Sequence, residues 1–182
     1  MTFTEAQRDM DYAYFGGATG VLVSGLVWCA AGFIGLLHST QASMYALFIG
    51  GMFIFPLGML MSKACKRPGK HKPENPLNKL ALESTIIIFV GLFLAFSVSN
   101  LQLTWFYPIM LLAIGVRYLV FNSLYGNRTY WILGAVMMLG GVYCMLFNAH
   151  FIVGAFVGGV SEVLFSLVIF NQSKSVLQSQ GN

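Results

Sequence analysis

Long apolar runs dominate the chain and predict helices that span a membrane. No Asp, Glu, Lys or Arg occurs from Tyr12 to Ser62, and this run is too long for a single crossing, which takes about 20 residues. Its only consecutive polar cluster is His38–Gln41. The run therefore predicts two helices joined by a tight turn.

The same pattern continues to the end of the chain and predicts six spans. Three prolines interrupt a polar, basic loop over residues 63–79 and deny it a continuous helix. Short polar turns separate the later runs. The predicted spans cover residues 12–37, 42–62, 80–99, 105–121, 129–147 and 151–170. The fold class is thus all-α, a polytopic membrane helix bundle with a single transmembrane domain over residues 1–182. Thr4 and Gln7 match a capping box, which predicts a short interfacial helix before the first span.

Composition agrees with this picture and excludes most soluble classes of protein. Of the 182 residues, 57% are hydrophobic and only 9% are charged, whereas soluble domains carry about a quarter charged residues. This leaves no room for a large extramembrane domain or a nucleotide-binding fold. The three cysteines imply no disulfide framework, and no cofactor is expected.

The distribution of basic residues predicts the orientation and one partner. Six of the ten Lys and Arg residues lie in the 63–79 loop, and the turns near His38, Gln102 and His150 contain none. Because basic loops stay in the cytoplasm, both termini are expected there. The basic loop is expected to meet anionic lipid. No basic stripe interleaved with aromatic residues occurs, so nucleic acid is not an expected partner.

Three ionisable residues, Glu83, Arg117 and Glu162, fall within predicted spans. A charged group at the centre of a span costs at least about 2.5–3.5 kcal/mol. By rise per residue, Glu83 and Arg117 share a level in the cytoplasmic half, and Glu162 lies near the midplane. Three interpretations stay open: a cavity for a proton, ion or solute, a buried ion pair between helices, and, for Glu83 and Arg117, side chains that reach the interface. The midplane position of Glu162 favours a functional role.

Small residues predict which helix faces pack together. Gly154 and Gly158 precede Glu162 at intervals of four residues, so all three lie on one helix face, and small residues there allow close helix packing. Glu162 is therefore expected to point into the bundle. Gly16 and Gly20 form a similar face on the first span.

Other candidate chemistry is sparse. His38 and His150 are weak candidates for a metal or haem ligand at the outer face, but no third ligand has suitable spacing, so no metal is expected. No HExxH motif, paired aspartates or Ser/His/Asp set is found, and no catalytic residue is assigned.

Several short motifs resemble a known group of proteins. They are Phe55-Pro56-Leu57 with Ser62-Lys63, then Asn75-Pro76-Leu77 with Lys79-Leu80, then Leu124-Tyr125-Gly126. Together they resemble a family of small uncharacterised bacterial membrane proteins with this length and number of spans. The resemblance implies a bacterial inner-membrane setting and no known activity.

These observations rank three function classes. A small permease or channel for an ion or small solute comes first, and its size favours a homodimer. A non-transporting scaffold, sensor or partner subunit is second, and a membrane-embedded enzyme is a distant third.

Overall fold

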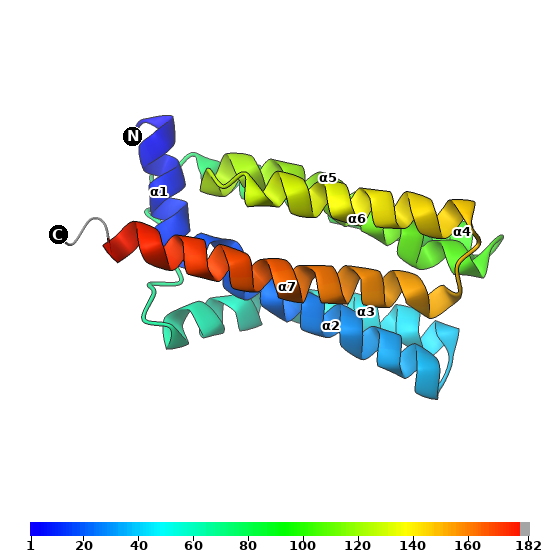
Figure 1. Ribbon diagram of the computed structural model, residues 1–182. Coiled ribbons are helices and arrows are strands. Elements are labelled where there is room, and N and C mark those ends of the chain that lie inside the picture. Colours follow the sequence, from blue (N-terminus) through cyan, green and yellow to red (C-terminus); the bar gives the residue numbers. More distant parts are fainter. Residues whose placement is uncertain (179–182) are drawn as a thin grey trace.

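The chain forms an all-helical bundle (Figure 1). The computed structural model describes the backbone of residues 1–178 and the side chains of residues 1–173. Within this part of the chain no β-strand occurs. The α-helices are α1 (Phe3–Tyr14), α2 (Ala18–Leu37), α3 (Thr40–Ala64), α4 (Leu77–Ser99), α5 (Phe106–Tyr125), α6 (Thr129–Leu146) and α7 (Phe151–Gln178), with short 3-10 helices η1 (Phe15–Gly17) and η2 (Leu103–Trp105).

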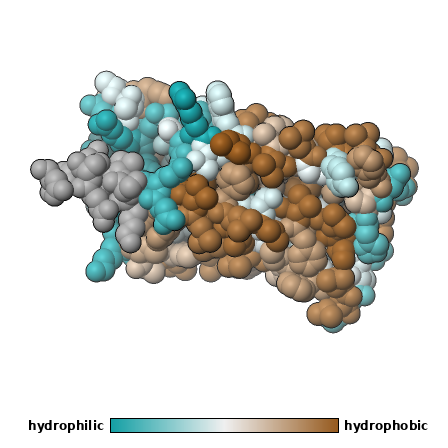
Figure 2. Space-filling model, in the orientation of Figure 1, coloured by the Kyte–Doolittle hydropathy of each residue, from teal (hydrophilic) through white to brown (hydrophobic). Residues whose placement is uncertain are grey.

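Six segments are long and apolar enough to cross a membrane, which confirms the predicted number of spans. Only 17–39% of the residues in their most apolar windows are buried inside the protein, so most of their side chains face outward. Figure 2 shows the result, a largely hydrophobic surface over the bundle with hydrophilic residues gathered at its two ends, most of them at the end where α1 lies. The protein is therefore a multi-pass membrane protein.

The structure differs from the single helix predicted over residues 12–37. The chain breaks at η1, where Phe15, Gly16 and Gly17 all have positive φ values, between 56° and 80°. Two consecutive glycines make this left-handed turn accessible. The turn separates α1 from α2, and Figure 1 shows α1 at a steep angle to the long helices.

The cap of α1 also differs from the sequence prediction. Thr2, not Thr4, is the capping residue: its hydroxyl accepts a hydrogen bond from the Glu5 N–H at 3.3 Å, and the Glu5 carboxylate accepts one from the Thr2 N–H at 2.7 Å. The capping box therefore starts two residues earlier. The predicted short helix before the first span is present as α1.

Helices α2 and α7 form the central pair of the bundle. α3 packs on the other side of α2, α6 packs on α5 and contacts α7, and α4 packs on α5. Glycines set the closest approaches: a Cβ on Gly25 of α2 would lie 2.8 Å from the Gly159 carbonyl of α7, and a Cβ on Gly58 of α3 would lie 3.0 Å from the Gly20 Cα. The helices meet where side chains are absent.

The loop between α3 and α4 folds against α1 and closes one end of the bundle, here called the charged end. The Asn75 side chain donates hydrogen bonds to the Ala6 carbonyl at 3.0 Å and to the Asp9 carboxylate at 2.7 Å. Arg67 is buried, with its guanidinium carbon 4.4 Å from the centre of the Phe15 ring and 5.0 Å from that of Tyr12. This cation–π contact ties the loop to the turn between α1 and α2.

The charged end contains the exposed lysines, so we expect it to face the cytoplasm. In a cysteine-free background, Lys70→Cys should be protected from an impermeant thiol reagent in intact bacterial cells and labelled in inverted membrane vesicles. His38→Cys, at the opposite end, should show the reverse pattern. Both side chains are exposed, so accessibility to the reagent depends only on the side of the membrane. Labelling of Lys70→Cys in intact cells would contradict the orientation.

Candidate functional site

Glu162 lies at the centre of the bundle. It is the middle residue of the 23-residue span Phe151–Ser173, and its side chain is completely buried. One turn before it, a Cβ on Gly158 would lie 2.5 Å from the Trp28 ring of α2. The close contact between α2 and α7 therefore encloses the carboxyl group and keeps it away from lipid.

The Glu162 carboxyl group is only half satisfied. Tyr118 of α5, also buried, donates a hydrogen bond to Oε1 at 2.7 Å. Ser24 of α2 lies beside the same carboxyl group, yet Oε2 has no hydrogen-bond partner. A buried polar atom without a partner is costly and calls for an explanation. One explanation is a proton or cation that occupies this position during function.

Arg117 directly precedes Tyr118 on α5. Among the residues that the structure describes, Arg117 forms no ion pair with Glu162 or with Glu83. Its guanidinium carbon lies 4.9 Å from the centre of the Phe121 ring, and its buried Nε has no hydrogen-bond partner. Arg117 therefore contributes positive charge near the carboxyl group without neutralising it by contact.

A stack of three tyrosines leads from Glu162 toward the charged end. Tyr118 stacks on Tyr130 of α6 with ring centres 5.8 Å apart, and Tyr130 stacks on Tyr125 of α5 at 5.6 Å. The Tyr130 hydroxyl donates a hydrogen bond to the Gly16 carbonyl in the turn between α1 and α2. This tyrosine stack thus connects the mid-span carboxyl group with the turn that closes the charged end.

The turn at η1 fits tightly over the tyrosine stack. Gly17 has φ +80°, and a Cβ there would lie 2.5 Å from the Tyr130 hydroxyl and 2.8 Å from the Tyr125 ring. Beside it, Ser173 of α7 donates a hydrogen bond to the partly buried Asp11 carboxylate at 3.1 Å. Glycine is required at residue 17 both by its conformation and by the close approach of the rings.

The structure places the other predicted residues as follows. Glu83 is exposed on α4 and is not brought to Glu162 or into the interior. Gly16 lies in the η1 turn, whereas Gly20 and Gly154 lie at helix contacts, Gly20 against Gly58 and Gly154 against Tyr107. His38 and His150 are exposed, and no group of three His, Cys, Asp or Glu among the described residues is arranged to hold a metal ion.

The tyrosine stack that begins at the carboxyl group was not predicted from the sequence. Tyr118, Phe121 and Tyr125 recur at intervals of three and four residues on α5, which places them on one helix face. That spacing could have predicted an aromatic face on this helix. The pairing of this face with Tyr130 and with Glu162 depends on contacts between separate helices, which the spacing does not specify.

Because the exposed Glu83 has no ion pair with Arg117, the two residues should contribute to stability independently. The change in unfolding free energy for Glu83→Leu with Arg117→Leu should equal the sum of the single changes to within about 0.5 kcal/mol. Denaturant unfolding in detergent gives the unfolding free energy of the wild type, the two single variants and the double variant. A coupling clearly above that value would show that the two side chains interact in the membrane protein.

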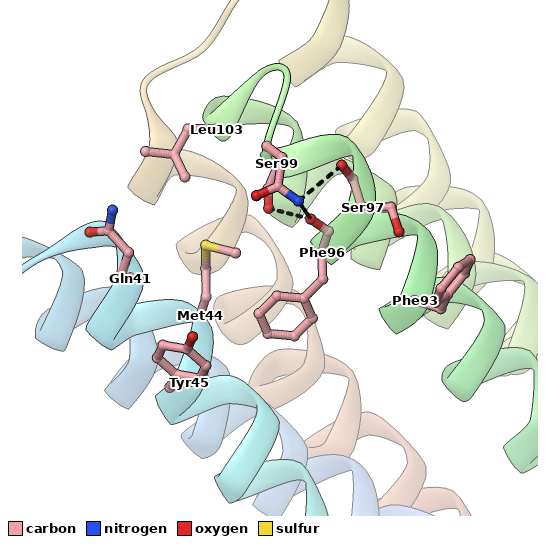
Figure 3. Close-up of a pocket in the computed structure, with 9 residues that line it drawn as sticks. Gln41, Met44, Tyr45, Phe93, Phe96, Ser97, Ser99 and Leu103 are labelled. Carbon is pink, nitrogen blue, oxygen red and sulfur yellow. Dashed lines mark hydrogen bonds between the residues drawn. The ribbon is translucent and has the colours of Figure 1, made fainter.

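A second feature is a groove of about 630 Å³ between α3 and α4, at the end opposite the charged end. Figure 3 shows side chains from both helices around it. Its lining comprises Gln41, Met44, Tyr45, Phe93, Phe96, Ser97, Ser99, Asn100 and Leu103. Glu162 is not part of this lining, so the groove and the carboxyl site are separate features.

Six apolar helices, with a buried carboxyl group inside the bundle, define a polytopic α-helical membrane protein. The chain belongs to the DUF7010 family, described as a family of unknown function, whose model matches residues 3–172. The expected membership in an uncharacterised membrane protein family is confirmed. No curated protein and no solved structure matches the chain.

Proposed function

We propose that this protein is a small permease-like protein of the bacterial inner membrane in which Glu162 binds a proton or a small cation. The observation that carries the proposal is the unpartnered Oε2 of a fully buried, mid-span glutamate. Ionisable residues at this depth commonly mark ion pathways and proton relays. A purely structural ion pair is a weaker explanation here, because Arg117 makes no ion pair with Glu162.

The surroundings of Glu162 favour a small cationic ligand over a larger solute. The carboxyl group lies between α2, α5 and α7, where Tyr118 and the Gly158–Trp28 contact occupy the adjacent volume. A proton or a small dehydrated cation fits one carboxylate oxygen with little rearrangement. The tyrosine stack supplies hydroxyl groups on the side toward the charged end, and we propose this side as the route of entry.

Glu162→Gln should abolish proton or cation flux and leave the fold intact, because glutamine keeps the shape and hydrogen bonding of the side chain but does not titrate. The protein is reconstituted in liposomes that contain a pH-sensitive dye, and flux is driven by an imposed potential. Replacing sodium by potassium or by an impermeant cation identifies the transported ion.

Glu83→Gln is the matched control, since it removes an exposed carboxyl group from another span. Glu83→Gln should retain flux at the wild-type rate. Equal flux in wild type and in a stably folded Glu162→Gln variant would refute the role of Glu162. Absence of flux from wild-type liposomes would refute the permease proposal as a whole.

A scaffold or sensor is the alternative function, and one observation favours it. The loop between α3 and α4 is ordered against α1 by Asn75 and Arg67, and this arrangement leaves Lys63, Lys66 and Lys70 exposed. A fixed set of lysines at the membrane surface suits anionic lipid or an acidic cytoplasmic partner. A homodimer, which the small size of the chain favours, is compatible with either proposed function.

A further inference from the structure

The groove between α3 and α4 exists because these two helices pack on different neighbours. The close glycine contacts of α3 go to α2, where Gly50 meets Val27 and Gly58 meets Gly20. The close contact of α4 goes to α5, where a Cβ on Gly91 would meet the Ala113 side chain. In the most apolar part of α3 and in that of α4, only 17% of the residues are buried inside the protein. Across the groove, the Phe96 ring contacts the rings of Tyr45 and Phe48.

The lining of the groove changes from polar to apolar along its length. Gln41 is in the first turn of α3 and Asn100 directly follows α4, so both lie at the membrane–water boundary. Tyr45 lies about 6 Å deeper than Gln41, and Phe93 about 10 Å deeper than Asn100, at 1.5 Å per residue. The groove therefore offers polar groups where a lipid head would lie and rings where its chain would lie.

The polar groups of the groove are uncharged. None of its lining residues is Asp, Glu, Lys or Arg. The Asn100 amide donates hydrogen bonds to the Phe96 and Ser97 carbonyls, which leaves its Oδ1 as an acceptor. Gln41 Nε2 and the Ser97 hydroxyl have no partners among the described residues and are available as donors. A phosphate head would find no cation here, whereas hydroxyl, ester or carbonyl oxygens would find matching groups.

We propose that this groove binds a neutral membrane lipid, with an uncharged hydroxyl- or carbonyl-bearing head at Gln41, Ser97 and Asn100 and its chain beside Tyr45 and Phe93. The absence of charge in the lining selects against anionic phospholipids. This proposal does not depend on transport through Glu162. The groove would bind a neutral lipid, whereas the Glu162 site would bind a proton or a small cation.

Quenching of tryptophan fluorescence by brominated lipids tests this proposal. Tyr45→Trp reports from the groove, and Tyr143→Trp reports from a lipid-facing position on α6 near the same end of the bundle. The two native side chains are equally exposed, at 59% and 58%. Each variant is placed in phosphatidylcholine nanodiscs with a small fraction of brominated diacylglycerol or brominated phosphatidylglycerol, and quenching of the parent protein is subtracted.

Tyr45→Trp should be quenched by brominated diacylglycerol in preference to phosphatidylglycerol by roughly fivefold in apparent affinity, which corresponds to about one net hydrogen bond. Tyr143→Trp should show no preference. Adding Gln41→Leu and Ser97→Ala, both at exposed positions, should remove the preference and leave the fold unchanged. Equal quenching of the two reporters, a preference for phosphatidylglycerol, or a preference that survives the double change would overturn the proposal.

Discussion

Gly158→Leu should strongly destabilise the protein. A Cβ on Gly158 would already lie 2.5 Å from the Trp28 ring, and Trp28 is fully buried against Tyr107. Because the ring has no space into which to move, α7 must separate from α2. Overpacking costs typically about 1–3 kcal/mol, and we expect a loss at or above the upper value.

Gly51→Leu is the matched control for this change. Gly51 lies in the middle of α3, and a Cβ there would have no neighbour within 4 Å. A leucine at this position would face lipid and should leave the unfolding free energy nearly unchanged or raise it, since glycine is a poor helix former. Thermal unfolding in detergent measures both variants. Equal stability of the two would show that α2 and α7 do not approach closely at Gly158.

Tyr118→Phe should cost about 1–3 kcal/mol of unfolding free energy, because it removes the hydrogen bond that the Tyr118 hydroxyl donates to the buried Glu162 carboxyl group. In a Glu162→Leu background the same change should be neutral or stabilising, since the Tyr118 hydroxyl then has no acceptor to lose. The difference between the costs of Tyr118→Phe in the two backgrounds measures the coupling of the pair.

Tyr143→Phe is the control for the Tyr118 cycle. Tyr143 is 58% exposed and its ring packs against Phe147, as Tyr118 packs against Tyr130. Loss of its hydroxyl should change stability little in either background. If Tyr118→Phe cost the same with and without Glu162, the hydrogen bond between these residues would contribute nothing to stability.

The spans were predictable from the sequence because lipid imposes a simple requirement on them. A long, strongly apolar run is satisfied in lipid only as a membrane-spanning helix, and polar turns interrupt such runs, so the six spans could be predicted from residue type. The inward orientation of Gly154 and Gly158 follows the same logic. Small residues at intervals of four have no reason to recur on a face that meets only lipid.

The remaining features depend on contacts between segments far apart in the chain. The break at Phe15–Gly17 is stabilised by the Arg67 guanidinium and by the Tyr130 hydroxyl, which come from a loop and from α6. Nothing within residues 12–37 identifies these partners. Glu83 illustrates the opposite case: its depth resembles that of Arg117, but depth does not determine which face of a helix meets the bundle.

The central proposal for this protein is that Glu162 gains and loses a proton or cation inside the bilayer. Infrared difference spectroscopy of the reconstituted protein tests it directly, because the C=O stretch of a protonated carboxyl group in an apolar site is separate from that of exposed acids. We predict a carboxyl band that appears and disappears as the pH is stepped or a cation is added, and that Glu162→Gln removes while Glu83→Gln retains. A spectrum without a band assignable to Glu162 under any of these conditions would contradict the claim and leave the carboxyl group a structural element of the bundle.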